Sequence, residues 1–74
     1  MSTTTYGVTG MTCGHCVHAV TEEVKKIQGV KDVEVSLVTG GASQVTVTSD
    51  AELTVDDVRA AVDEAGYELA GASA

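Results

Sequence analysis

Hydrophobic and polar residues alternate strictly in two short stretches in the middle of the chain. In residues 32–37 a valine or leucine occupies every second position, and in residues 45–48 valine alternates with threonine. A period of two is typical of a strand that buries one face and leaves the other in water. Residues 39–43, between them, contain two adjacent glycines and have the composition of a turn. The pattern predicts a β-hairpin whose buried face carries Val33, Val35, Leu37, Val45 and Val47.

A helical period precedes this hairpin. Its hydrophobic positions recur every three or four residues, at Val17, Val20, Val24 and Ile27. This spacing predicts an amphipathic helix that begins at or just after Cys13-Gly14. Gly29 is placed to end the helix as its C′ residue, with two lysines near the negative end of the helix dipole.

A second helical period follows the hairpin. Thr54 can cap the start of this helix through its hydroxyl, and the two aspartates after it suit the positive end of the dipole. Gly66 is expected to close the helix. The predicted buried stripe consists of Val55, Val58 and Val62, with Ala61 and Ala65 beside it.

The remaining segments complete one domain. A short strand over residues 5–9 precedes the first helix, and residues 67–70 can form a last strand. The order β-α-β-β-α-β predicts an α+β, ferredoxin-like sandwich, in which two helices cover one face of a four-stranded antiparallel sheet. We expect a single domain over residues 1–74, with an ordered core over about residues 3–70 and a frayed tail over 70–74.

Composition and charge exclude several functions. The 74 residues carry 11 acids against 4 bases, a formal charge of -7, which leaves no basic face for nucleic acid or for an anionic membrane. No apolar run approaches the length of a transmembrane helix, and the first residues do not resemble a signal peptide. These observations predict a cytoplasmic protein without stable membrane insertion, in a reducing compartment where disulfides are rare.

The two cysteines of the chain, Cys13 and Cys16, are three residues apart at the start of the first predicted helix. At this spacing a cytosolic pair is typical of metal binding or redox chemistry. The helix start lowers the expected pKa of both thiols, and it brings their sulfurs close enough to converge on one ion. Soft thiolates select soft ions, so the pair favours Cu(I).

Other chemistries match the cysteine pair less well. Structural zinc needs four ligands, and His15 and His18 share one turn and a half with the cysteines. Attachment of haem needs a histidine directly after the second cysteine, where Val17 stands. The sequence Cys-Gly-His-Cys also matches the active site of protein disulfide isomerases, but the chain has no proline to lie opposite the motif. A thiol-disulfide oxidoreductase remains an alternative. The preferred interpretation is a metal-binding protein that is not an enzyme.

With its Met-x-Cys-x-x-Cys loop and β-α-β-β-α-β order, the chain resembles heavy-metal-associated (HMA) domains, and most of all the CopZ-type bacterial copper chaperones. The resemblance implies that Cys13 and Cys16 bind Cu(I) and pass it by ligand exchange to a metal-binding domain of a copper-transporting P-type ATPase. A metal-binding domain of such an ATPase and a mercury-binding relative remain alternatives. We expect a monomer without copper, with a copper-bridged dimer as the alternative when copper is bound.

The resemblance also assigns supporting residues. Met11 is expected to pack inward and support the loop rather than bind the metal, and Tyr67 is expected beside the loop, where it shields the site, donates a hydrogen bond or simply packs. His15 is expected either to tune the acidity of the thiols through its charge, to supply an auxiliary ligand, or to be only solvated. His18 is expected to be solvated. The expected docking face comprises Thr9–Cys16 and Tyr67, with charge supplied by Glu22, Glu23 and Glu68.

Overall fold

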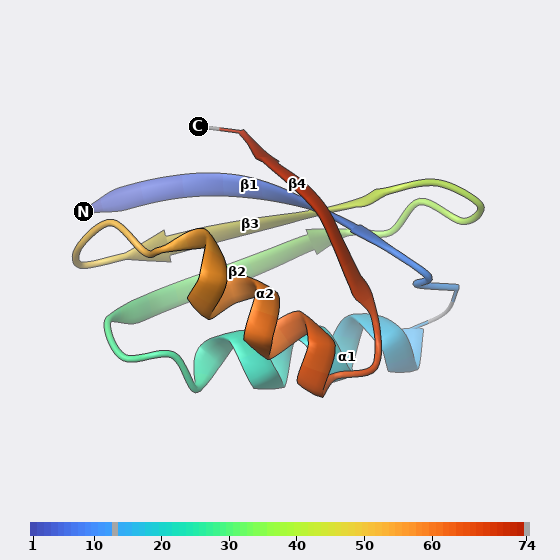
Figure 1. Cartoon of the computed structure of the whole chain (residues 1–74), viewed down its shortest axis with the longest axis horizontal. Coiled ribbons are helices and arrows are strands. Elements are labelled where there is room, and N and C mark those ends of the chain that lie inside the picture. Colours follow the sequence, from blue (N-terminus) through green and yellow to red (C-terminus); the bar gives the residue numbers. More distant parts are fainter. Residues whose placement is uncertain (13, 74) are drawn as a thin grey trace.

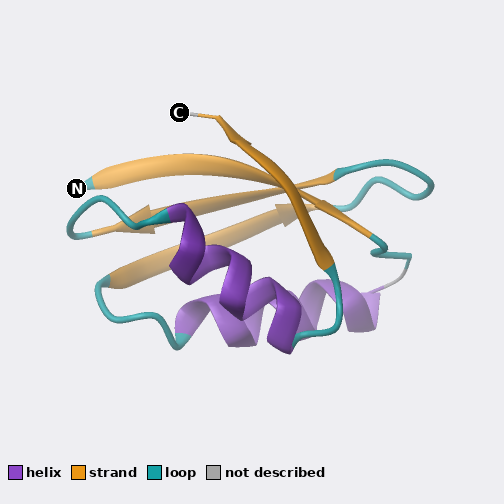
Figure 2. Cartoon of the chain, in the orientation of Figure 1, coloured by secondary structure: helices purple, strands orange, loops and turns teal. Residues whose placement is uncertain are grey.

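The computed structural model describes residues 1–12 and 14–73, with only the backbone described for Ala72 and Ser73. It confirms the predicted order of elements (Figures 1 and 2). The elements are β1 (Ser2–Thr9), α1 (Gly14–Lys25), β2 (Val30–Ser36), β3 (Ser43–Ser49), α2 (Val55–Glu64) and β4 (Glu68–Ser73). None of the helices in this part of the chain is both long enough and apolar enough to cross a membrane.

The four strands form one antiparallel sheet in the order β2-β3-β1-β4. The predicted hairpin is present: Val33 lies opposite Val47 and Val35 opposite Val45, so the alternating valines of β2 and β3 share one face. Both helices lie against the same face of the sheet (Figure 1). The ferredoxin-like fold class is therefore confirmed.

The core lies between the sheet and the two helices and is built mostly from valine. Small β-branched side chains suit a thin layer between a sheet and short helices, because they pack closely without large rings. Tyr6, which the sequence pattern does not single out, is almost completely buried. The innermost residues are Tyr6, Val8, Met11, Val20, Val24, Val45, Val47, Val58 and Val62.

Both predicted ends of α2 are confirmed. The Thr54 hydroxyl accepts a hydrogen bond from the Asp57 N–H at 3.3 Å, which satisfies one donor at the helix start. At the other end the Gly66 N–H donates to the Asp63 carbonyl and the Tyr67 N–H donates to the Val62 carbonyl. This pair of bonds is a Schellman motif with Gly66 at C′, where φ is 94°.

Replacing Gly66 with alanine should therefore lower the free energy of unfolding by about 1–2 kcal/mol, because a Cβ is disfavoured at this positive φ. Gly71→Ala is the matched control, since a Cβ there meets open space at an ordinary φ. Urea denaturation of the two variants measures the difference. Equal stability of the two variants would contradict the assigned helix end.

Several predicted details are wrong. Helix α1 ends at Lys25 rather than just before Gly29, because the chain tightens into short turns in which Ile27 N–H bonds to Val24 and Val30 N–H bonds to Ile27. Val55, in the first turn of α2, is 42% exposed and does not belong to the buried stripe. Leu37 lies beyond the end of β2 and is 38% exposed.

The first and last strands of the chain are longer than predicted. β1 starts at Ser2, and β4 continues to Ser73, where it pairs with Thr5 of β1. The expected frayed tail is therefore absent as far as Ser73, because β1 offers hydrogen-bonding partners along this whole length. The register shifts between Gly7 and Val8, which bends the sheet edge at this point.

Candidate metal centre

In the loop between β1 and α1, the chain turns toward the core at Met11 and returns to the surface at Thr12. Gly10 has a φ of 92°, a conformation that favours glycine, and it lets the chain reverse after Thr9. Met11 then points into the core and is 1% exposed, whereas Thr12 is exposed. The expected inward packing of Met11 is thus observed, and its side chain anchors the loop to the helix-covered face of the sheet.

Cys16 lies in the first turn of α1 and is buried, with 6% of its surface exposed. The Thr12 N–H donates to the Cys16 Sγ at 3.5 Å, and the Thr12 hydroxyl lies 3.9 Å from the same sulfur. Donors aimed at sulfur stabilise negative charge there, as does the nearby helix start. The arrangement suits a thiolate that binds a soft cation.

Cys16 contributes to the core, unlike a cysteine that lies wholly in an exposed loop. It belongs to the same buried cluster as Met11 and Val20. The reason is the helical period: Cys16 precedes Val20 by four residues and Val24 by eight, so the three lie on one face of α1. Cys16 is therefore both a candidate ligand and a core residue.

Cys13 lies outside the described residues, so the convergence of its sulfur with that of Cys16 stays a prediction. Within the described part of the chain, no group of three or more His, Cys, Asp or Glu side chains is arranged to hold a metal ion. Of the two cysteines predicted as ligands, Cys16 is thus the one that can be placed among residues 1–12 and 14–73.

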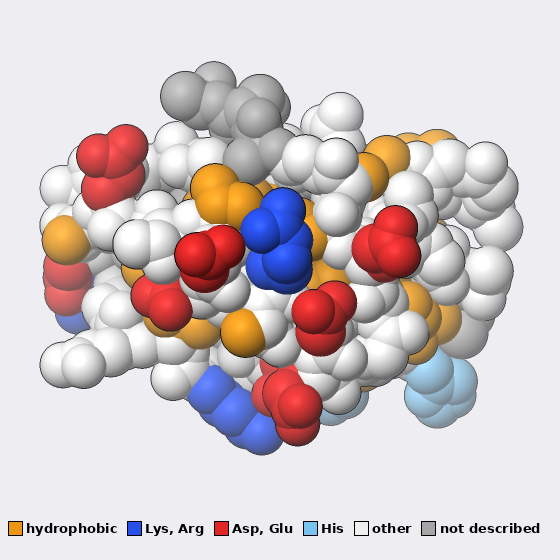
Figure 3. Space-filling model, in the orientation of Figure 1, with side chains coloured by type: hydrophobic (Ala, Val, Ile, Leu, Met, Phe, Trp, Pro, Cys, Tyr) orange, Lys and Arg blue, Asp and Glu red, His pale blue; other side chains and the backbone are white. Residues whose placement is uncertain are grey.

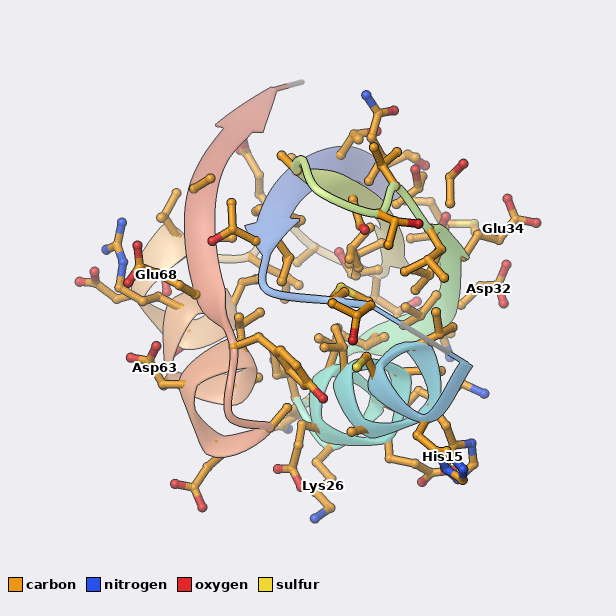
Figure 4. The ribbon with its side chains drawn as sticks, turned by 90° about the vertical axis from the view of Figure 1, so that its right-hand side faces the viewer. His15, Lys26, Asp32, Glu34, Asp63 and Glu68 are labelled. Carbon is orange, nitrogen blue, oxygen red and sulfur yellow. The ribbon has the colours of Figure 1, made fainter. Side chains whose placement is uncertain are left out.

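The two histidines lie on the outer surface of α1. His15 is exposed and lies at the periphery of the molecule in Figure 4, although it directly precedes the buried Cys16. Successive helical residues point about 100° apart, which explains the opposite environments. His18 is exposed as expected, with its Nε2 3.7 Å from the Glu22 Oε1. A tuning or auxiliary role of His15 stays a prediction.

Tyr67 is brought beside the loop by the end of α2. The Schellman motif directs the chain from Gly66 back toward β1, and a Cβ built on Gly10 would lie 3.5 Å from the Tyr67 Cδ1. The half-buried ring therefore packs against the loop at Gly10, where the positive φ favours glycine. Shielding or hydrogen bonding at the metal by Tyr67 stays a prediction.

Thr12 is a candidate site residue whose contact with the Cys16 sulfur the sequence reasoning missed. Its position four residues before Cys16, next to a predicted helix start, is the available signal, because threonine often supplies donors and acceptors to the first helical turn. Only the folded loop shows that its N–H points at the sulfur.

Two of the three glutamates expected to flank a docking face already contact a basic side chain. Glu23 accepts a hydrogen bond from the Lys26 Nζ at 3.0 Å, and this contact raises the pKa of Lys26 above its usual value. Glu22 lies beside His18. Glu68 begins β4, and Figure 4 shows it on the opposite side of the molecule from His15.

The comparisons with known proteins agree with this geometry. The model of the heavy-metal-associated domain family matches residues 5–68. The chain is 39% identical to the copper chaperone CopZ of Bacillus subtilis over 71 residues, which cover 95% of this chain and 99% of that protein. The protein therefore belongs to the heavy-metal-associated domain family.

Two further relatives show the range of proteins that contain this domain. A 67-residue match at 33% identity covers 90% of this chain but 4% of human copper-transporting ATPase 2. A solved structure of a CopZ metallochaperone superposes with a TM-score of 0.78 at 35% identity, covering 92% of this chain and 98% of that one. The same domain thus occurs as a small chaperone and as a short part of a large pump.

Proposed function

We propose that this protein is a cytoplasmic Cu(I) metallochaperone that binds copper through Cys13 and Cys16 and delivers it to a copper-transporting P-type ATPase. The observation that carries the proposal is the buried Cys16 sulfur at the start of α1, which receives the Thr12 N–H at 3.5 Å. Among the relatives, the match to CopZ along 99% of that chaperone's length supports the proposal.

The donor chemistry favours Cu(I) as the cargo. Thiolate is a soft ligand, and two thiolates satisfy Cu(I), whereas zinc in structural sites takes four ligands. Binding requires both thiols to lose their protons, so copper affinity falls as the pH falls. Copper stays in the +1 state throughout, and no reaction beyond ligand exchange is needed, which is why we do not propose an enzyme.

Delivery proceeds by exchange of thiolates. A thiol of the acceptor loses its proton and bonds to the copper, after which one Cu–S bond to the donor breaks and the released thiolate takes up a proton. A second exchange of the same kind completes the transfer. Each step keeps at least two sulfurs on the copper, so the ion never has to be released into water.

The match to human copper-transporting ATPase 2 favours a second candidate, a metal-binding domain of a copper pump. Such a domain would hold copper in the same way but would receive it instead of delivering it. A thiol-disulfide oxidoreductase, the alternative that the sequence leaves open, can be distinguished from both candidates by an activity measurement. It would reduce insulin disulfides and would not need to bind copper tightly.

The test begins with an anaerobic titration of the reduced protein with Cu(I) against a chromophoric chelator. We expect one tightly held equivalent and a monomer before copper is added. The copper-loaded protein is then mixed with the amino-terminal domain of the copper pump from the same cell, and copper in each protein is measured after separation. Tight binding without any transfer would contradict delivery and favour copper storage, and insulin reduction without tight binding would favour the oxidoreductase.

A further inference from the structure

The stretches of chain that form the β1–α1 loop and the β2–β3 turn contain no charged residues. All Asp, Glu, Lys and Arg residues fall within residues 22–34 and 50–68, so residues 1–21 and 35–49 contain none. Figure 1 places the β1–α1 loop and the β2–β3 turn, which belong to these uncharged stretches, at the same end. In Figure 3 the acidic side chains gather over α2, whereas the end with the β2–β3 turn shows mainly uncharged atoms. The loop before Cys16 thus contains no charged residue itself, and Glu68, which pairs with Thr9 at its start, is a charged neighbour.

A groove of about 240 Å³ separates this loop from the β2–β3 turn. Residues 9–12 line one wall, and Gly40, Gly41 and Ala42 line the other. The groove exists because the facing turn residues have small side chains or none. It begins at Thr12, the residue whose N–H contacts the Cys16 sulfur, so the groove and the metal loop form one continuous surface.

The turn also presents two exposed apolar side chains, of which Val38 lies beside the groove: a Cβ built on Gly41, a groove residue, would lie 3.3 Å from the Val38 Cγ1. Leu37 is 38% exposed and Val38 is 43% exposed. The backbone at Val38 is held in place, because the buried Ser43 hydroxyl accepts the Val38 N–H at 2.8 Å and donates to the Val38 carbonyl at 3.3 Å. Rigid, exposed apolar groups next to a binding site are typical of a contact surface for another protein.

We propose that this groove, together with Leu37 and Val38, is the docking surface for the metal-receiving domain, and that it takes an uncharged, apolar thiol-bearing loop of that domain. The inference rests on the proposed function. Because the Thr12 N–H donates to the Cys16 sulfur, an acceptor thiol that approaches copper at Cys16 comes beside the loop over residues 9–12. The β2–β3 turn is the opposite wall of the groove beside that loop, so the acceptor covers it too.

This surface differs from the acid-flanked docking face that the sequence suggests. Of those acids, Glu22 and Glu23 lie beside His18 and Lys26. Glu68 pairs with Thr9 next to the groove but is not among the residues that line it. Interfaces are generally depleted of charge at their centre, and an uncharged centre agrees with recognition by shape. The acidic remainder of the molecule then affects the encounter rate more than the docked contact.

The test compares two equally exposed valines. Val38→Asp places a charge in the proposed surface, whereas Val55→Asp places it on a valine that is 42% exposed at the start of α2, at the other end of the molecule (Figure 1). We expect Val38→Asp to slow Cu(I) transfer to the pump domain by about tenfold or more, because an unpaired charge must be desolvated on docking. Val55→Asp, Glu22→Gln and Glu23→Gln should stay within about twofold of the wild type.

The remaining measurements separate docking from metal binding and folding. Both aspartate variants should hold Cu(I) against the chelator as the wild type does, and Leu37→Ser should slow transfer in the same direction as Val38→Asp. Equal transfer rates for Val38→Asp and Val55→Asp, or a larger effect of the glutamate variants, overturn the inference and leave the proposed function standing. Tight copper binding by a wild type that transfers none overturns delivery, and this inference with it.

Discussion

Replacing Cys16 with serine is expected to abolish tight Cu(I) binding and also to destabilise the fold. A hydroxyl is a poor ligand for a soft ion, and the loss of a direct ligand should exceed the roughly 10–100-fold that losing a partner of a ligand costs. Because the Cys16 side chain is 6% exposed, the serine hydroxyl also replaces a weakly polar sulfur in the core. That change should lower the free energy of unfolding by about 1–3 kcal/mol.

Two controls separate the binding effect from the folding effect. Cys13→Ser should abolish tight binding equally. We expect it to leave the apo stability nearly unchanged, because the sequence predicts Cys13 in the loop before the helix. Cys16→Ala should abolish binding without burying a hydroxyl. Chelator competition measures the binding, and urea denaturation of the apo proteins measures the stability. A single-serine variant that still holds one tight equivalent would rule out the two-thiolate site.

Met11→Ala is expected to leave much of the protein unfolded. Met11 is 1% exposed and contacts the main core, and removing a buried methionine typically costs about 2–5 kcal/mol. A domain of this length has roughly 3–5 kcal/mol from its core, so the loss consumes most of the stability. The measurement is a thermal melt followed by circular dichroism, without metal.

A matched substitution distinguishes packing from ligation at this position. Met11→Leu conserves the volume and should cost less than about 1.5 kcal/mol, with Cu(I) held as tightly as by the wild type. Val55→Ala, at an exposed valine, should change stability by no more than about 0.5 kcal/mol. Copper affinity that falls in Met11→Leu while the fold persists would mean that the Met11 sulfur is a ligand, contrary to the packing role.

The elements that the sequence predicts correctly depend on local patterns. The alternation in residues 32–37 and 45–48 reports which face of a strand is buried, and the glycines between them mark the turn. Thr54 and Gly66 define the ends of α2 because a hydroxyl cap and a positive φ are requirements of the nearest few residues. The cysteine spacing indicates metal chemistry for the same reason, since both predicted ligands lie within four residues.

Element ends and side-chain surroundings are predicted less well, because distant segments decide them. β4 extends to Ser73 because β1, far away in sequence, continues to offer backbone partners. Val55 fits the helical period of α2 but lies in its first turn, where it is left exposed. A periodic pattern reports which face of an element can be buried, and it does not report how far the neighbouring element reaches.

For this protein the sequence by itself determined the β-α-β-β-α-β order, the sheet-and-helix class and the cysteine pair at a helix start, because short-range spacing and local propensity specify them. Only the tertiary structure decided that Cys16 is a core residue under the Thr12 N–H, that the Tyr67 ring packs against Gly10, and that the β2–β3 turn faces the metal loop across a groove. The groove and the Tyr67 contact join segments that are far apart in the chain. The packing of the helices on the twisted sheet brings them together, and no local pattern encodes that geometry.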